Sequence, residues 1–216
     1  MALKLLSWII GGVMMAGTLG FAEERMQPVQ LPAPDMVGGR PLMEVLQKRQ
    51  SMRNIDNREI PVQTLSNLLW AGFGINRPES GKRTAPSAVN AQEIDIYVAM
   101  QKGLYIYKPK THTLNPLIFK DMRTIANESP TVLNAPVLLI YVADYSKMPK
   151  FNQEIRDFFS AVDTGFISQN VYLFCASEGL ATVVMGSFNR DVLTKEMNLK
   201  KEQKIILIQP VGYPKQ

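Results

Sequence analysis

The sequence predicts an α+β fold with a central sheet, on the evidence of three segments. Residues 94–114 alternate apolar and polar side chains on both sides of the turn sequence QKG, which predicts a β-hairpin or meander. Residues 135–144 form a continuous apolar run of strand length, which is typical of a buried central strand. Residues 152–178 give the longest helical pattern, and it ends at Gly179. Helices and strands alternate irregularly along the chain, which indicates the α+β class.

The first 22 residues have the layout of a secretory signal peptide. Lys4 precedes an apolar run from Leu5 to about Ala16, and the small residues before position 23 are followed by the polar sequence EER. The run is shorter than the roughly 20 residues that a spanning helix needs, so a membrane anchor is the weaker alternative. We therefore expect cleavage after Ala22, export to the periplasm and no stable membrane anchor afterwards.

The remaining chain divides into an arm and one domain. Residues 23–40 are rich in proline and glycine and lack periodicity, which predicts an extended N-terminal arm rather than a packed element. The predicted domain occupies residues 41–216. Its other expected elements, in chain order, are helices at 41–50 and 61–72, a long polar loop at 75–92, a strand at 180–188, a helix near 189–197 and a last strand at 204–214.

The predicted 152–178 helix is apolar around much of its circumference. Its apolar residues include Ile155, Phe158, Val162 and Phe166. A helix with more than one apolar stripe is usually buried on several sides, either in a core or in a subunit interface.

Composition excludes several classes of site. Without Lys4, 23 basic and 19 acidic residues leave a net charge of +4, and the cations are scattered, so no nucleic-acid partner is expected. Cys175 is the only cysteine and is expected to be a small buried hydrophobe. His112 is the only histidine, and we expect it in a surface turn; no metal site is predicted.

Three polar segments are the candidates for a ligand site, because the sequence contains no nucleophile elbow, Walker loop, dinucleotide fingerprint or histidine-based triad. In RQSMR (49–53), an extended backbone would point Arg49, Ser51 and Arg53 the same way, with no carboxylate nearby, which predicts an anionic ligand. APSAVNAQ (85–92) supplies a hydroxyl, amides and backbone donors. VVMGSFN (183–189) has a glycine that would let the backbone approach a planar ligand. For each segment alone, an ordinary solvated loop is the alternative.

Together and in this order, the segments resemble the nitroreductase family of FMN-dependent oxidoreductases, closest to the shorter branch that includes SagB-type dehydrogenases. The resemblance runs from about Pro41 to Pro214 and rests on RQSMRNID, RTAPSAVNAQEIDIYV, NAPVLLIYVAD, DTGFISQNVYLFCASEGLATVVMGSF and PVGYP. It implies a central, mainly antiparallel sheet flanked by helices, with a long buried interface helix. It also implies a homodimer with two FMN sites, each lined by both subunits.

The resemblance also implies roles for individual residues. Arg49 and Ser51 would hold the phosphate side of FMN, Arg53 would lie near the pyrimidine edge of the flavin, and Asn90 would bond to the ring. A backbone amide at Gly186-Ser187 would face flavin N5. The full implied cofactor-binding set is Arg49, Gln50, Ser51, Arg53, Pro86, Ser87, Ala88, Asn90, Gly186, Ser187 and Lys215. No side chain is assigned a catalytic role, because FMN would carry the chemistry.

The sequence departs from the family pattern at two places, one expected near the flavin ring and one expected near the phosphate. Many members have Glu-Gly where this chain has Gly186-Ser187. Many also supply phosphate-binding cations beyond the last strand, where this chain has only Lys215; Lys82 or Arg83 are the alternatives.

The expected function is a ping-pong hydride transfer from a reduced donor such as NAD(P)H, through FMN, to a small organic acceptor such as a nitroaromatic or a quinone. One alternative is a non-catalytic protein that binds a flavin or a related ligand on the same fold. Another is an exported anion-binding module without flavin.

Overall fold

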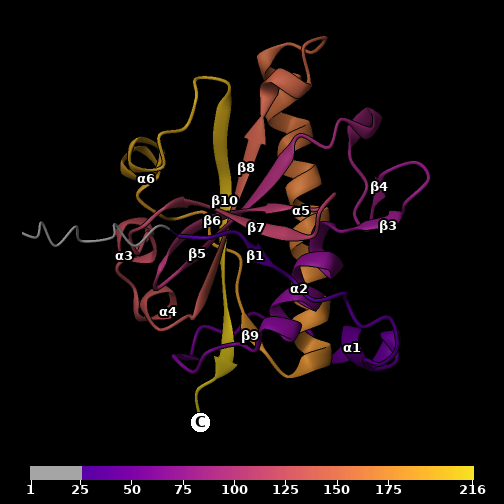
Figure 1. Cartoon of the computed structure of the whole chain (residues 1–216), viewed down its shortest axis with the longest axis vertical. Coiled ribbons are helices and arrows are strands. Elements are labelled where there is room, and N and C mark those ends of the chain that lie inside the picture. Colours follow the sequence, from indigo (N-terminus) through magenta and orange to yellow (C-terminus); the bar gives the residue numbers. More distant parts are fainter. Residues whose placement is uncertain (1–25) are drawn as a thin grey trace, which may run out of the picture.

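A computed structural model describes residues 26–216 of the chain (Figure 1), and the expected signal peptide lies outside these described residues. The central feature is an eight-stranded sheet with the order β1-β7-β6-β5-β8-β10-β2, in which β9 also pairs with β10. All of its pairings are antiparallel, which confirms the predicted sheet type. The strands are β1 Val29–Gln30, β2 Ile55–Asp56, β5 Ile94–Met100, β6 Gly103–Lys108, β7 Thr113–Ile118, β8 Val137–Asp144, β9 Ala181–Thr182 and β10 Gln203–Pro214, and a separate hairpin joins β3 Ile75–Arg77 to β4 Lys82–Arg83.

The helices lie on both faces of this sheet. Figure 1 shows α1, α2 and α5 together on one side and α3, α4 and α6 on the other. The helices are α1 Leu42–Lys48, α2 Val62–Phe73, α3 Arg123–Ala126, α4 Pro130–Leu133, α5 Gln153–Glu178 and α6 Arg190–Glu196, with single 3₁₀ turns η1 Ala88–Asn90 and η2 Tyr145–Lys147. Within residues 26–216, none of these helices is long and apolar enough to cross a membrane.

Strand β8 is buried on both faces, as its continuous apolar run predicts. Its residues Leu139 and Tyr141 belong to the core beneath α2 and α5, whereas Leu138 and Ile140 belong to the core beneath α3, α4 and α6. Successive side chains of a strand point to opposite faces, so one strand contributes to both cores. Cys175 is buried in the first core, where burial raises the pKa of its thiol, and this confirms its predicted structural role.

Helix α5 is bounded by strong caps. The Asn152 side chain accepts a hydrogen bond from the Ile155 backbone amide at 2.9 Å, and Gly179 adopts the left-handed conformation that ends the helix, with φ of 70°. These caps fix the helix at the boundaries that the sequence predicts.

The C-terminal half of α5 buries apolar residues such as Ile167 and Val171, whereas its N-terminal half buries polar residues and exposes apolar ones. The residues that it buries include Ser160, Asp163 and Thr164, whereas Phe158 and Phe166 are 64% and 45% exposed. The second apolar stripe predicted from the sequence is therefore present, but it is uncovered in the single chain.

The segment expected to be an unpacked arm is in part a packed element. Val29 and Gln30 form β1 at the edge of the sheet against β7, and Leu31 is buried. A strand of only two residues can pair with a sheet edge, but it is too short to show an alternating pattern in the sequence. That is why residues 29–31 were expected to be unpacked.

His112 lies in the β6–β7 turn, as expected, but its side chain is more than a solvated surface group. His112 has the left-handed backbone of a turn, but its half-buried ring bonds through Nε2 to Ser66 Oγ at 2.6 Å and through Nδ1 to Tyr107 OH at 2.9 Å. The Ser66 hydroxyl donates to the Pro32 carbonyl, so this network fastens the chain near β1 to α2 and the β6–β7 turn. Burial lowers the pKa of His112.

Gly212 offers a test of the packing between β10 and its neighbours. A Cβ at this position would lie 2.5 Å from Ile55 Cγ2 and 2.7 Å from Pro136 Cδ. We expect Gly212→Ala to lower the free energy of unfolding by about 1–3 kcal/mol in urea denaturation, because the added methyl overpacks this contact. Gly186→Ala is the control, since its added methyl meets only Leu207 Cδ2, at 3.7 Å. Equal stability of the two variants would contradict the described packing.

Candidate functional site

The RQSMR segment leaves α1 as extended chain. Arg49 caps α1 with φ of −57° and ψ of 121°, and the Met52 backbone amide donates to the Thr182 carbonyl in β9 at 2.9 Å. The segment is therefore fixed between the end of α1 and the strand that leads to Gly186. The extended backbone agrees with the prediction from the alternating side chains.

The two arginines of this segment are available to a ligand. Neither Arg49 nor Arg53 forms an ion pair with any carboxylate within residues 26–216. The Arg49 guanidinium lies 5.4 Å from the centre of the Tyr172 ring, while Arg53 is exposed. Two guanidinium groups without a carboxylate partner suit an anion.

Tyr172 of α5 connects the two candidate segments that lie in this region. Its hydroxyl accepts a hydrogen bond from the Val184 backbone amide at 2.8 Å and lies 3.0 Å from Ser51 Oγ. Tyr172 is 8% exposed and so is held by the fold rather than by solvent. The sequence patterns did not indicate Tyr172, whose hydroxyl stands in the otherwise apolar stretch VYLFCA.

The segment of residues 184–187 ends in two free backbone donors. Met185 forms a bridge with Ile208 of β10, but the amides of Gly186 and Ser187 donate to no acceptor in the described part of the chain. Both residues are exposed, and the Ser187 carbonyl is held by the Asn127 side chain at 3.0 Å. A Cβ at Gly186 would meet no close contact within this chain. Packing therefore does not require glycine here, and its absence of a side chain leaves space beside the two free amides.

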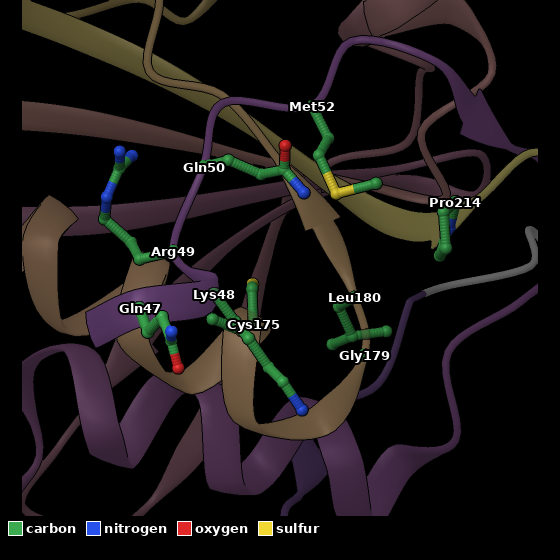
Figure 2. Close-up of a pocket in the computed structure, with 10 residues that line it drawn as sticks. Gln47, Lys48, Arg49, Gln50, Met52, Cys175, Gly179, Leu180 and Pro214 are labelled. Atoms are coloured by element: carbon green, nitrogen blue, oxygen red, sulfur yellow. The ribbon is translucent and has the colours of Figure 1, made fainter. Parts of the chain in front are cut away.

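A pocket of about 380 Å³ lies on one side of the RQSMR segment. It is bounded by the end of α1, the last turn of α5, Leu180 and Pro214 (Figure 2). Figure 2 shows the Gln50 and Met52 side chains over Cys175, whereas the Arg49 side chain leaves the segment in the opposite direction. Arg49 and Gln50 thus both line the pocket, although their side chains leave the segment in different directions.

The cations considered for a phosphate lie elsewhere. Lys215 lines a separate small pocket with Asp56 and Asn134, and its backbone amide donates to the Asn54 carbonyl. Arg83 is used by the fold: its guanidinium donates to Gln92 Oε1 at 2.9 Å and to the Phe73 carbonyl, and burial lowers its pKa. Lys82 is exposed on β4.

The loop of residues 86–90 is held by Asp163, near the middle of α5. The Ala88 amide donates to Asp163 Oδ2 at 2.8 Å, and Ser87 Oγ accepts from the Gln92 amide at 2.9 Å. Pro86 and Asn90 are exposed.

One chain does not bring all the predicted site residues together. Ser51 and the 184–187 segment meet at Tyr172, but Ala88 is attached at Asp163. These anchors are nine residues apart on α5, which at 1.5 Å per residue is about 13 Å along the axis. The predicted set is therefore divided into two half-sites, which we call the arginine half-site (49–53 with 184–187) and the loop half-site (86–90).

The arginine half-site fits the chemistry of FMN. It combines two guanidinium groups without carboxylate partners, a hydroxyl and two free backbone amides. Such a set of donors suits a ligand with a phosphate and a ring edge rich in acceptors. Within residues 26–216, no group of three or more His, Cys, Asp or Glu side chains is placed to hold a metal ion.

Comparisons with known proteins agree on one family. The family model described as "Nitroreductase family" matches residues 46–213. A curated protein of Methanocaldococcus jannaschii, assigned by its name to the nitroreductases, is 28% identical over 194 residues, which cover 85% of this chain and 95% of the relative.

Solved structures support the same grouping. A Ralstonia eutropha structure whose name assigns it to the nitroreductases has a TM-score of 0.84 and 39% sequence identity. The match covers 88% of this chain and 91% of the Ralstonia eutropha chain. The NADPH:FMN oxidoreductase of Vibrio harveyi, solved with NAD+, has a TM-score of 0.61 at 18% identity, covering 81% of this chain and 69% of its own, which shows likeness of fold.

The link made by Tyr172 can be tested without a ligand. We expect Tyr172→Phe to lower the free energy of unfolding by about 1–2 kcal/mol in urea, because the half-buried Val184 amide loses its acceptor. Tyr105→Phe is a matched control: Tyr105 is 7% exposed, and its hydroxyl bonds to no residue that the structure describes. A Tyr172→Phe protein as stable as the Tyr105→Phe protein would show that this hydroxyl does not hold the segment.

Proposed function

Because the chain belongs to the nitroreductase family, a family of flavin-dependent oxidoreductases, we propose that it binds FMN and transfers hydride between small molecules. When bound, FMN would supply the redox chemistry, taking a hydride from a reduced donor such as NAD(P)H and returning it to a small organic acceptor such as a nitroaromatic or a quinone. The protein would bind FMN, orient the donor and the acceptor beside it, and shield the site from water.

The observation that carries this proposal is the arginine half-site. Arg49 and Arg53 have no carboxylate partner in the described chain, and Tyr172 joins the Ser51 side chain to the Val184 amide, two residues before the free amides of Gly186 and Ser187. A fold that leaves charged donors unpaired at one place has an acceptor to recruit from outside.

We assign the residues of this half-site as follows. Arg49, with Ser51 and Gln50, would bind the phosphate side, and Arg53 would lie near the pyrimidine edge, where a cation favours negative charge on the reduced ring. The Gly186 and Ser187 amides would donate to the ring. Lys215 remains a candidate for the phosphate only if its side chain leaves the pocket that it shares with Asp56.

We also propose that the protein is a homodimer. The outward face of α5 exposes Phe158, Val162 and Phe166, while the same helix buries Ser160 and Asp163. An apolar stripe of this kind on a helix supports contact with another apolar surface, and a second copy of the chain offers the same stripe. This contact would place the loop half-site of one subunit over the arginine half-site of its partner.

The place of action is proposed from the sequence. The signal-peptide pattern of residues 1–22 favours export to the periplasm, where nicotinamide cofactors are scarce, so the physiological donor is proposed to be a different reductant if export occurs. Assignment to the SagB-type branch likewise stays a prediction.

Flavin binding should depend on Arg49. We expect the purified protein to show the visible absorption of FMN or to bind added FMN, and Arg49→Gln to weaken binding by about 2 kcal/mol, roughly thirtyfold in Kd, through loss of a charge-assisted hydrogen bond. Lys201→Gln removes a charge from an exposed turn and should leave Kd unchanged. A colourless protein that does not bind added FMN would refute the proposal, and FMN binding without turnover for any donor and acceptor would favour a binding protein instead.

The dimer should depend on the outward stripe of α5. We expect Phe166→Glu to raise the dissociation constant of the dimer by at least about tenfold, since it buries a charge in an apolar contact, and to weaken FMN binding with it. Mass by light scattering at several concentrations measures this. Val192→Glu, at an exposed apolar residue of α6, is the control and should remain dimeric. A wild-type protein that is monomeric at all concentrations would contradict the proposed assembly.

A further inference from the structure

Glu93 is a buried acid that the proposed site does not use. It lies directly before β5, its side chain is 0% exposed, and neither carboxyl oxygen has a hydrogen-bond partner within residues 26–216. Glutamate is almost never fully buried without a partner, because an unpaired charge there costs too much free energy. The fold therefore either keeps this carboxyl group protonated or bears the free-energy cost of an unpaired buried charge.

The group beside Glu93 is a second acid. Asp163 of α5 is 2% exposed and faces Glu93, as does the Ser160 hydroxyl. Burial, with the neighbouring Asp163 carboxyl, raises the pKa of Glu93 to about 7, and burial also raises the pKa of Asp163. Two adjacent buried carboxyl groups do not readily ionise together, so one proton is retained by the pair.

Asp163 is also the anchor of the loop half-site, through the 2.8 Å hydrogen bond from the Ala88 amide. That loop needs an anchor, because two of its residues have left-handed backbones, Val89 with φ of 48° and Asn90 with 55°, and so does Gln92 just after it, with 48°. Such conformations are unfavourable, above all for a β-branched residue, and persist only where surrounding contacts hold them.

The cations near the loop do not neutralise the acid pair. Arg83 is bonded to Gln92 Oε1 and to the Phe73 carbonyl, and Lys147 is bonded to the Gln92 carbonyl and to Asp95.

The remaining titratable group facing Glu93 is Tyr145, on η2. Its hydroxyl donates to Asp157, which is paired with Lys204. None of these groups forms a salt bridge with Glu93 or Asp163.

We propose that Glu93 and Asp163 share one proton and act as a positioning pair for residues 86–92. With the proton on Glu93, its hydroxyl donates to the Asp163 carboxylate, and that carboxylate holds the Ala88 amide. Loss of the proton to solvent leaves two adjacent buried charges, which repel each other and release the loop. The contact between this loop and flavin rests on the proposed function. The holding of the loop by the acid pair is independent of it.

The proposal fixes the sign of a pH effect. Glu93 has a raised pKa in the folded chain and an ordinary pKa of about 4.5 when unfolded, so the folded state binds more protons between these values. Its contribution to stability therefore falls as pH rises from about 4.5 to about 7 and is constant above that range. Glu93→Gln, a neutral isostere whose amide can still donate to Asp163, removes this dependence.

The test is hydrogen exchange of the Ala88 amide, measured by NMR and corrected for its intrinsic rate. We expect the wild-type protection factor to fall by up to about tenfold from about pH 6 to about pH 8, and the Glu93→Gln factor to stay within about twofold. Glu44→Gln, at a surface acid paired with Arg40 and Lys48, should behave as wild type. A wild-type protection factor that is constant over this range overturns the proposal even if Glu93→Gln does not fold.

FMN titrations at the same pH values separate this inference from the proposed function. Binding that weakens above about pH 7 in the wild type but not in Glu93→Gln supports both. Loop protection that follows the titration of Glu93, with no FMN binding at any pH, supports the positioning pair and overturns the flavin proposal. FMN binding together with loop protection that does not change as Glu93 titrates supports the flavin proposal and overturns the positioning pair.

Discussion

The structure depends on helix α5 and on the two hydrogen-bonding side chains that it buries. Tyr172 fixes the arginine half-site by bonding to Ser51 and the Val184 amide, and Asp163 fixes the loop half-site through Ala88. Because a helix is stiff, the distance between these anchors is set at about 13 Å and cannot close by local motion. The proposed homodimer would bring the arginine half-site of one chain to the loop half-site of the other.

The same helix explains why a small chain without a nucleophile or a metal cluster in its described residues could still support redox chemistry. Its inner face carries groups that orient loops, and its outer face carries the apolar stripe that a second copy would cover. A ligand bound at the arginine half-site would also exclude water there. Hydrogen bonds from Arg49 and Arg53 to a bound anion become stronger as the local dielectric constant falls.

Long elements could be predicted from the sequence, whereas short contacts could not. The bounds of β8 and α5 follow from apolar runs and a C-terminal glycine, but strands of two residues such as β1 and β2 are too short to show a period. The apolar residues of α5 were recognised, but not that they point outward, since either face of such a helix can be the buried one. The role of Tyr172 and the bond from His112 to Ser66 were missed because these partners are distant in sequence, and no motif indicated the pairing of Glu93 with Asp163.

The central claim is that each flavin site is built from both subunits, and subunit mixing tests it directly. Chains carrying Arg49→Gln are paired with chains carrying Asn90→Ala, each of which alone should bind FMN poorly. In a mixed dimer, shared sites place both defects in one site and leave the other intact, so our account predicts about one tightly bound FMN per dimer. If each site belonged to a single chain, both sites would be defective, and a mixed dimer without tight binding would contradict the account.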